Sequence, residues 1–105
     1  MTHTVYRERL AERDLLEHIA YLSQERPDVA VRFIDAVEQA CMQLATMPRM
    51  GAPRAFSNPR LKGVRLWPVP GFDKYLIFYQ FMNDEIRILR ILHGARDIPA
   101  ILESD

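Results

Sequence analysis

The chain has 105 residues, 49% of them hydrophobic, and its 14 basic residues balance its 14 acidic residues to give a formal net charge of zero. This size and composition predict a single domain over residues 1–105 that buries a core without metal or disulfide help, and they exclude extended disorder. No run approaches the roughly eighteen apolar residues of a membrane-spanning helix, and the N-terminus does not resemble a secretory signal, so we expect a cytoplasmic protein.

Charge is distributed unevenly along the chain. Residues 49–74 contain six basic residues and only Asp73 as an acid, a local charge of +5, whereas residues 1–48 and 75–105 carry −3 and −2. Such a segment can contact a phosphate backbone or an acidic partner. Charge alone favours a plainer interpretation, in which a solvated loop pairs its arginines with the acidic helices.

The first predicted elements are a short strand and a helix. Residues 4–7 alternate and contain Thr, Val and Tyr, which suits a half-buried strand. From Ala11 the apolar residues recur at helical spacing, and this helix is expected to end near Arg26 because the residue before Pro27 disfavours the α conformation. The apolar stripe consists of Leu15, Leu16, Ile19, Ala20 and Leu22.

A second helix is predicted from Asp28, a good N-cap residue, to the stop formed by Pro48 and Gly51. Its apolar face carries Ala30, Phe33, Ile34, Val37, Cys41 and Leu44. Cys41, the only cysteine, is therefore interpreted as a buried structural thiol and not as a nucleophile. The short link between the helices predicts an antiparallel hairpin whose joint apolar face packs on a sheet.

Residues 49–62 predict a loop, and residues 64–69 predict a strand in which Pro68 indicates a bulge or an early end. Residues 70–73 supply a turn. Two apolar strands, 74–82 and 85–93, then flank Asn83-Asp84, a dipeptide that suits a two-residue hairpin turn. The expected cross-strand pairs are Met82/Glu85, Phe81/Ile86, Gln80/Arg87, Tyr79/Ile88, Phe78/Leu89, Ile77/Arg90, Leu76/Ile91, Tyr75/Leu92 and Lys74/His93.

Neither face of this hairpin is cleanly polar, so we expect it to be covered on both sides. The helices supply one cover, and we expect a partner to supply the second. Residues 98–102 predict only a short helical turn or a docked tail, with Pro99 in the first turn. The predicted order is β-α-α-β-β-β, an α+β fold in which an antiparallel sheet carries the N-terminal helical hairpin on one face.

Together these features resemble the ParE-type toxins of the RelE/ParE superfamily. The resemblance rests on Asp14-Leu15 and Ile19-Ala20-Tyr21 in the first helix, the helix exit Leu-Ala-Thr-Met-Pro-Arg-Met-Gly at residues 44–51, Tyr-Leu-Ile-Phe-Tyr at 75–79 and the ending Arg-Ile-Leu-His-Gly-Ala-Arg-Asp at 90–97. It covers almost the whole chain. The Leu-His-Gly-Ala-Arg-Asp ending and the Pro-x-x-Gly exit are its most specific parts.

The resemblance implies the toxin of a type II toxin–antitoxin pair, inactive while a cognate antitoxin lays a helix and an extended segment over it. ParE-like members of the superfamily are thought to act on DNA gyrase and so block replication, whereas RelE-like members are ribosome-dependent messenger RNA endonucleases. We expect neither a cofactor nor a metal, no membrane partner, and no sequence-specific binding of nucleic acid.

The nuclease alternative would use Arg65, His93 and Arg96 to activate the 2′-hydroxyl and to stabilise charge on the phosphate, with Lys62 and Arg90 as further cations. The aromatic acid/base near the C-terminus of the nucleases has no counterpart, because Leu102 occupies its natural position. We therefore favour gyrase inhibition by surface recognition, with an mRNA endonuclease as the alternative.

Contacts with a target or partner are expected at Arg54, Arg60, Lys62, Arg65, Trp67 and Arg96. Structural alternatives remain beside these roles. Arg90 is expected to pair with Asp14 or Glu17 on the first helix. His93 can simply end a strand with a hydrogen bond, and Trp67 suits the rim of the core as well as it suits a contact anchor.

Overall fold

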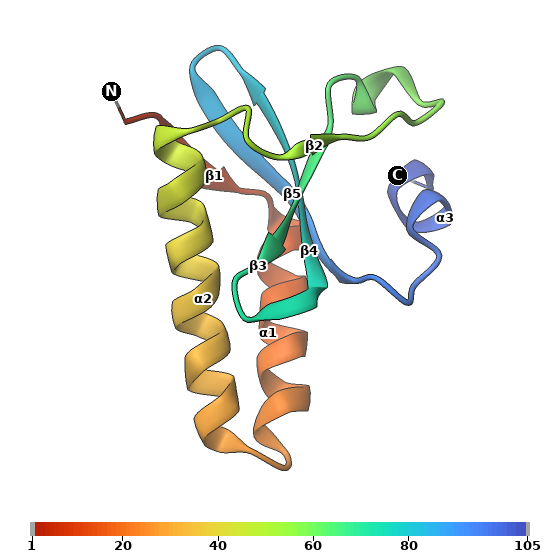
Figure 1. Ribbon diagram of the computed structural model, residues 1–105. Helices are drawn as coiled ribbons and strands as arrows, with labels where there is room; N and C mark the ends of the chain where they lie inside the picture. The colour runs from red at the N-terminus through yellow and green to blue at the C-terminus, as the bar shows by residue number, and fades with distance from the viewer. Residues whose placement is uncertain (1, 105) are drawn as a thin grey trace.

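The computed structural model describes residues 2–104 and confirms the α+β fold (Figure 1). The elements in chain order are β1 (Thr4–Arg7), α1 (Arg9–Ser23), α2 (Pro27–Thr46), β2 (Ala52–Pro53), a 3₁₀ turn (Pro59–Leu61), β3 (Arg65–Val69), β4 (Phe72–Met82), β5 (Glu85–His93) and α3 (Ile98–Glu103). The predicted order is therefore correct, with two refinements. The loop predicted at 49–62 contains β2 and the 3₁₀ turn, and the predicted tail is the helix α3.

Five strands form one sheet in the order β1-β5-β4-β3-β2. Neighbouring strands are antiparallel except for β1 and β5, which run parallel to each other. The helical hairpin and the strands β2 to β4 separate these two strands in sequence. The register of β3 shifts between Pro68 and Val69, which confirms the bulge predicted from the proline.

The predicted β4–β5 turn is confirmed. Asn83 and Asp84 have φ values of 54° and 60°, the left-handed conformation that both positions of a type I′ turn require. The first four predicted pairs, from Met82/Glu85 to Tyr79/Ile88, are also confirmed.

Beyond Tyr79/Ile88 the predicted register is wrong by one residue. A bulge leaves Leu89 without a partner, and the observed pairs are Phe78/Arg90, Ile77/Ile91, Leu76/Leu92 and Tyr75/His93. The core explains the bulge. A regular strand would place Arg90 on the same face as Ile88, whereas the extra residue puts Ile91 there, and Ile88 and Ile91 are both fully buried.

The principal core lies between the helical hairpin and one face of the sheet, as predicted. It includes Leu15 of α1, Phe33, Val37 and Leu44 of α2, and Ile77, Tyr79, Ile88 and Ile91 of the sheet. Cys41 is 7% exposed, and burial raises the pKa of its thiol, as expected of a structural cysteine. Leu16 and Ile34 are corrections to the predicted stripes, because they are 65% and 36% exposed on the outside of the hairpin.

The start of α2 also differs from the prediction. Arg26 is the N-cap residue and Pro27 takes the first helical position, where its missing N–H costs no hydrogen bond. Asp28 lies in the first turn and makes no capping bond. Its carboxylate lies instead 3.6 Å from Arg26 and 3.9 Å from Arg32 in exposed ion pairs.

The opposite face of the sheet is covered by the chain itself, which corrects the expectation of a missing cover. A second apolar cluster comprises Leu61, Val64, Phe78, Leu92, Ile98 and Leu102. It lies under α3 and the segment 54–64, on the far side of the sheet from the helical hairpin (Figure 1). Phe78 and Leu92 are essentially inaccessible.

Polar contacts hold this second cover in place. The buried Gln80 donates through Nε2 to the carbonyl oxygens of Arg60 and Lys62, both at 2.9 Å. The Glu103 carboxylate accepts from the Asn58 N–H at 2.7 Å and from the Ser57 hydroxyl, so α3 is joined to the same segment. The second cover is thus anchored from the sheet and from the C-terminal helix.

Candidate functional site

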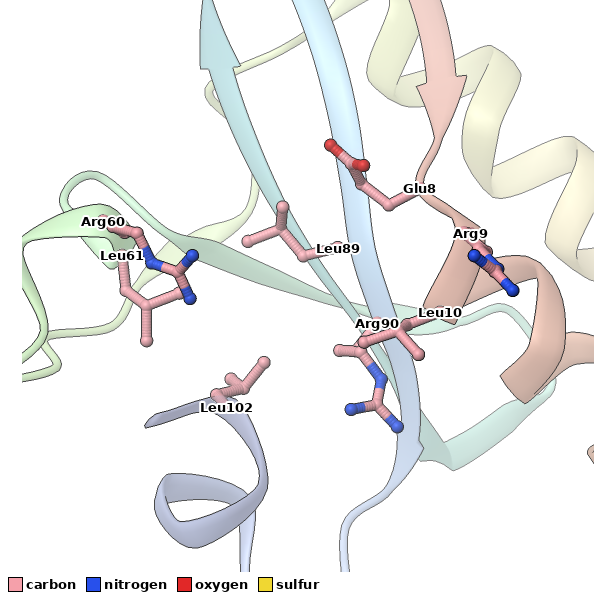
Figure 2. A pocket seen from close by; sticks show the side chains of 8 residues that line it. All are labelled: Glu8, Arg9, Leu10, Arg60, Leu61, Leu89, Arg90 and Leu102. Atoms are coloured by element: carbon pink, nitrogen blue, oxygen red, sulfur yellow. The ribbon is translucent and has the colours of Figure 1, made fainter. Parts of the chain in front are cut away.

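A groove of about 320 Å³ opens where the second cover meets the start of α1 (Figure 2). Its apolar lining is Leu10, Leu61, Leu89 and Leu102, named here the leucine groove. Arg9, Arg60, Arg90 and Glu8 surround these leucines. The bulge contributes directly to this site, because the unpaired Leu89 is one of the residues that line the groove.

The predicted pairing of Arg90 with Asp14 is confirmed. The guanidinium donates from Nε and from Nη2 to the two Asp14 oxygens at 2.7 and 2.8 Å, and Asp14 is 4% exposed. Asp14 Oδ2 also accepts the Ile91 N–H at 3.0 Å, while His18 Nε2 donates to the Ile91 carbonyl at 2.7 Å. β1 pairs with β5 only as far as Ile88. Beyond that residue, Asp14 and His18 of α1, which are one helical turn apart, form the hydrogen bonds to the edge of β5.

The basic segment surrounds β2 and the adjacent end of β3. We call Arg49, Arg54, Arg60, Lys62 and Arg65 the basic edge. Arg65 serves the fold, because Nη1 donates to the carbonyl oxygens of Arg49 at 3.1 Å and Gly51 at 2.8 Å. The Arg54 N–H donates to Val64 O at 2.9 Å, which fixes this loop to the start of β3.

Two arginines of the basic edge lie over aromatic rings. The guanidinium carbon of Arg49 is 5.1 Å from the centre of the Phe81 ring, and that of Arg54 is 5.7 Å from the centre of the Phe56 ring. Such stacking restricts the side chain while leaving the edge of the planar guanidinium able to donate hydrogen bonds.

The three nuclease candidates do not converge. Arg65 pairs with Tyr79 on β4, whereas His93, two strands away, is level with Tyr75. Four residues along β4 separate these levels by about 13 Å. Arg96 is exposed beyond the end of β5, and the Ala95 N–H donates to His93 Nδ1 at 3.1 Å. The hydrogen bond foreseen for His93 at the strand end is therefore present.

The remaining predicted contact residue, Trp67, is half-buried and packs against the principal core, as a residue of its rim does. Its Nε1 is buried, and within the described part of the chain it has no hydrogen-bond acceptor. A role as a contact anchor stays a prediction, as do the contact roles of Arg54, Arg60, Lys62, Arg65 and Arg96.

The sequence predicts Tyr79 as a core residue, which is confirmed, but it does not predict the contacts of its hydroxyl group with the chain next to the basic edge. Tyr79 is fully buried, its Oη accepts the Gly51 N–H at 2.9 Å, and it donates to the Pro48 carbonyl at 2.9 Å. Burial raises the pKa of this phenol, so it stays protonated and able to donate. The Pro-x-x-Gly exit of α2 is thereby attached to the central strand of the sheet.

No helix within residues 2–104 combines the length and apolar character needed to cross a membrane. In the same range, no three His, Cys, Asp or Glu side chains are grouped so that they could hold a metal ion. The expected absence of metals and cofactors remains a prediction.

The fold is similar to that of two solved toxin–antitoxin structures. The chromosomal ParDE TA system from P. aeruginosa matches with a TM-score of 0.70 and 22% identity, over 88% of this chain and 96% of that one. The toxin–antitoxin complex RelBE2 from Mycobacterium tuberculosis matches with a TM-score of 0.59 and 23% identity, over 91% and 95%. At these identities the likeness establishes the fold alone.

No curated protein sequence matches the chain significantly. The family described as the ParE toxin of the type II toxin–antitoxin system parDE, however, matches residues 5–98, which include both helices of the hairpin, the strands β2 to β5 and all of β1 but its first residue. The chain therefore belongs to the ParE toxin family of type II toxin–antitoxin systems.

Proposed function

We propose that this toxin is neutralised by a cognate antitoxin and acts by binding DNA gyrase, without a catalytic step of its own. Membership of the ParE toxin family supports the first part, and both matched structures are of toxin–antitoxin assemblies. The second part goes further than the family and rests on the arrangement of the candidate residues.

The observation that carries the non-catalytic mode is the separation of Arg65 from His93 and Arg96. RNA cleavage needs a base, an acid and charge stabilisation around a single phosphate. Here Arg65 donates to two loop carbonyls, and His93 lies about 13 Å further along the sheet and accepts a backbone N–H. This arrangement supports recognition of a protein surface over cleavage of RNA.

A supercoiling assay tests the gyrase proposal. Purified toxin is titrated into gyrase, ATP and relaxed plasmid, and we expect loss of supercoiled product once toxin and gyrase are near equal concentration. Relaxation of the same plasmid by a type I topoisomerase serves as the control and is expected to be unaffected. Unchanged supercoiling at a large excess of toxin would contradict the proposal, and new cuts in translated messages, seen by primer extension, would favour the nuclease alternative.

The leucine groove is the surface on which we propose that the antitoxin places an apolar segment. Leu10 and Leu89 remain partly accessible beside the buried Leu61 and Leu102 of the second cover. The exposed Arg9 at the rim suits an acidic residue flanking such a segment. Replacing Leu89 by Glu puts a negative charge on the apolar lining and is expected to weaken antitoxin binding at least tenfold.

Calorimetric titration with the purified cognate antitoxin measures this effect. Leu16→Glu is the matched control, because Leu16 is 65% exposed on the outer surface of α1 and does not line the groove. Both variants are first compared by thermal unfolding. Equal affinities of the two variants would place the antitoxin elsewhere.

A further inference from the structure

We propose that three cations of the basic edge, Arg49, Arg54 and Lys62, bind the phosphate backbone of duplex DNA without regard to sequence. The inference deepens the proposed action on gyrase, an enzyme that holds DNA, by naming DNA as a second ligand of the toxin. Only its biological setting rests on that proposed function, because the binding itself belongs to the isolated chain.

The first argument is charge. Arg49, Arg54 and Lys62 form no ion pair with any acid among residues 2–104. Many acids of the chain are engaged elsewhere, at positions that lie outside the basic edge: Glu8 and Glu85 with Arg87, Glu12 and Glu38 with Arg7, and Asp14 with Arg90. Charge alone favoured an interpretation in which the arginines of this segment pair with the acidic helices. Within the described residues, the structure shows no such pairing for Arg49, Arg54 and Lys62.

The second argument is that these cations are held in place. Arg49 and Arg54 stack on Phe81 and Phe56, which reduces the side-chain entropy lost when the guanidinium binds an anion. The backbone at Lys62 is fixed by Gln80, and the backbone at Arg49 is fixed by Arg65. A flexible basic loop would have to be ordered on binding, whereas this one is ordered already.

The third argument selects the ligand. Arg49 lies beside Phe81, whose side chain packs on the principal core. Gln80 precedes Phe81 in β4, so its side chain points to the opposite face of the sheet, where it binds the Lys62 carbonyl. The cations are therefore distributed around the edge of the sheet. Duplex DNA carries one negative charge per roughly 1.7 Å of its axis, so it can neutralise several scattered cations at once. An acidic protein would need carboxylates placed to match each of them.

Fluorescence anisotropy of a labelled 20-base-pair duplex of arbitrary sequence, titrated with purified toxin in 50 to 200 mM KCl, tests the inference. We expect a dissociation constant of roughly 10–100 µM at the lowest salt, and a slope of log K against log salt near −2.7, about −0.9 for each of three phosphate contacts. The triple variant Arg49→Gln, Arg54→Gln, Lys62→Gln should bind at least tenfold more weakly, with a slope near zero.

The matched control removes three cations from the helical hairpin: Arg13→Gln, Arg26→Gln and Arg32→Gln. It changes the net charge by the same amount at exposed positions away from the basic edge, so it should retain the affinity and salt slope of the unaltered toxin. An equal loss in both triple variants, absence of binding at 50 mM KCl, or tighter binding to poly-glutamate than to DNA would overturn the inference. Gyrase inhibition without DNA binding would overturn it and leave the proposed function standing.

Discussion

Replacing Asp14 by Ala is expected to destabilise the toxin by about 3–5 kcal/mol, because it removes the acidic partner of a buried ion pair. Arg90 would lose both of its hydrogen bonds to the carboxylate, and the Ile91 N–H at the edge of β5 would lose its acceptor. Urea unfolding followed by the fluorescence of Trp67 measures the change in the free energy of unfolding.

Glu17→Ala provides the matched control on the same helix. Glu17 is exposed and lies 3.9 Å from Arg13, a surface pair whose loss should cost less than about 0.5 kcal/mol. Asp14→Asn keeps a carbonyl oxygen for Ile91 but not the charge, so its stability should lie between that of Asp14→Ala and that of the unaltered toxin. A loss below 1 kcal/mol in Asp14→Ala would contradict the view that α1 closes the edge of β5.

This ion pair was foreseeable because an arginine among the isoleucines and leucines of 86–92 needs an acidic partner, and the first helix offers Asp14 on the side that packs towards the sheet. The bulge at Leu89 was not foreseeable from the strand pattern. Both faces of β5 are largely apolar, so a shift of one residue leaves the two-residue alternation almost unchanged. Only the packing of Ile91 into the core beside Ile88 selects the register.

The second cover escaped sequence analysis for a related reason. Its apolar residues come from a segment without regular periodicity, such as Leu61 and Val64, and from α3, a helix of only six residues. An irregular segment has no periodic pattern to detect, and a six-residue helix shows at most three residues of one face, here Ile98, Ile101 and Leu102. Charge composition did identify the basic segment, but only the structure separates Arg65, which holds carbonyls, from Arg49 and Arg54, which stack on rings.

Gly51→Ala is expected to destabilise the toxin by about 3 kcal/mol, through overpacking. An added Cβ would lie 2.5 Å from Tyr79 Oη, 2.7 Å from Tyr79 Cε1 and 2.8 Å from the Leu66 carbonyl oxygen. Neither neighbour can yield easily, since Tyr79 is fully buried and the Leu66 oxygen belongs to the backbone of β3. Gly94→Ala is the control for the substitution itself, because its Cβ would meet the nearest atom at an ordinary 3.4 Å and should cost less than about 1 kcal/mol.

A double-mutant cycle separates steric overlap from a general loss of loop structure. Tyr79→Phe removes the hydroxyl and leaves the Gly51 N–H and the Pro48 carbonyl without this partner, which should cost about 1–3 kcal/mol. Since the same change removes the atom nearest the new Cβ, the double variant should lose at least 1 kcal/mol less than the sum of the two single losses. Strictly additive losses would mean that Gly51 is needed for a reason other than its contact with Tyr79.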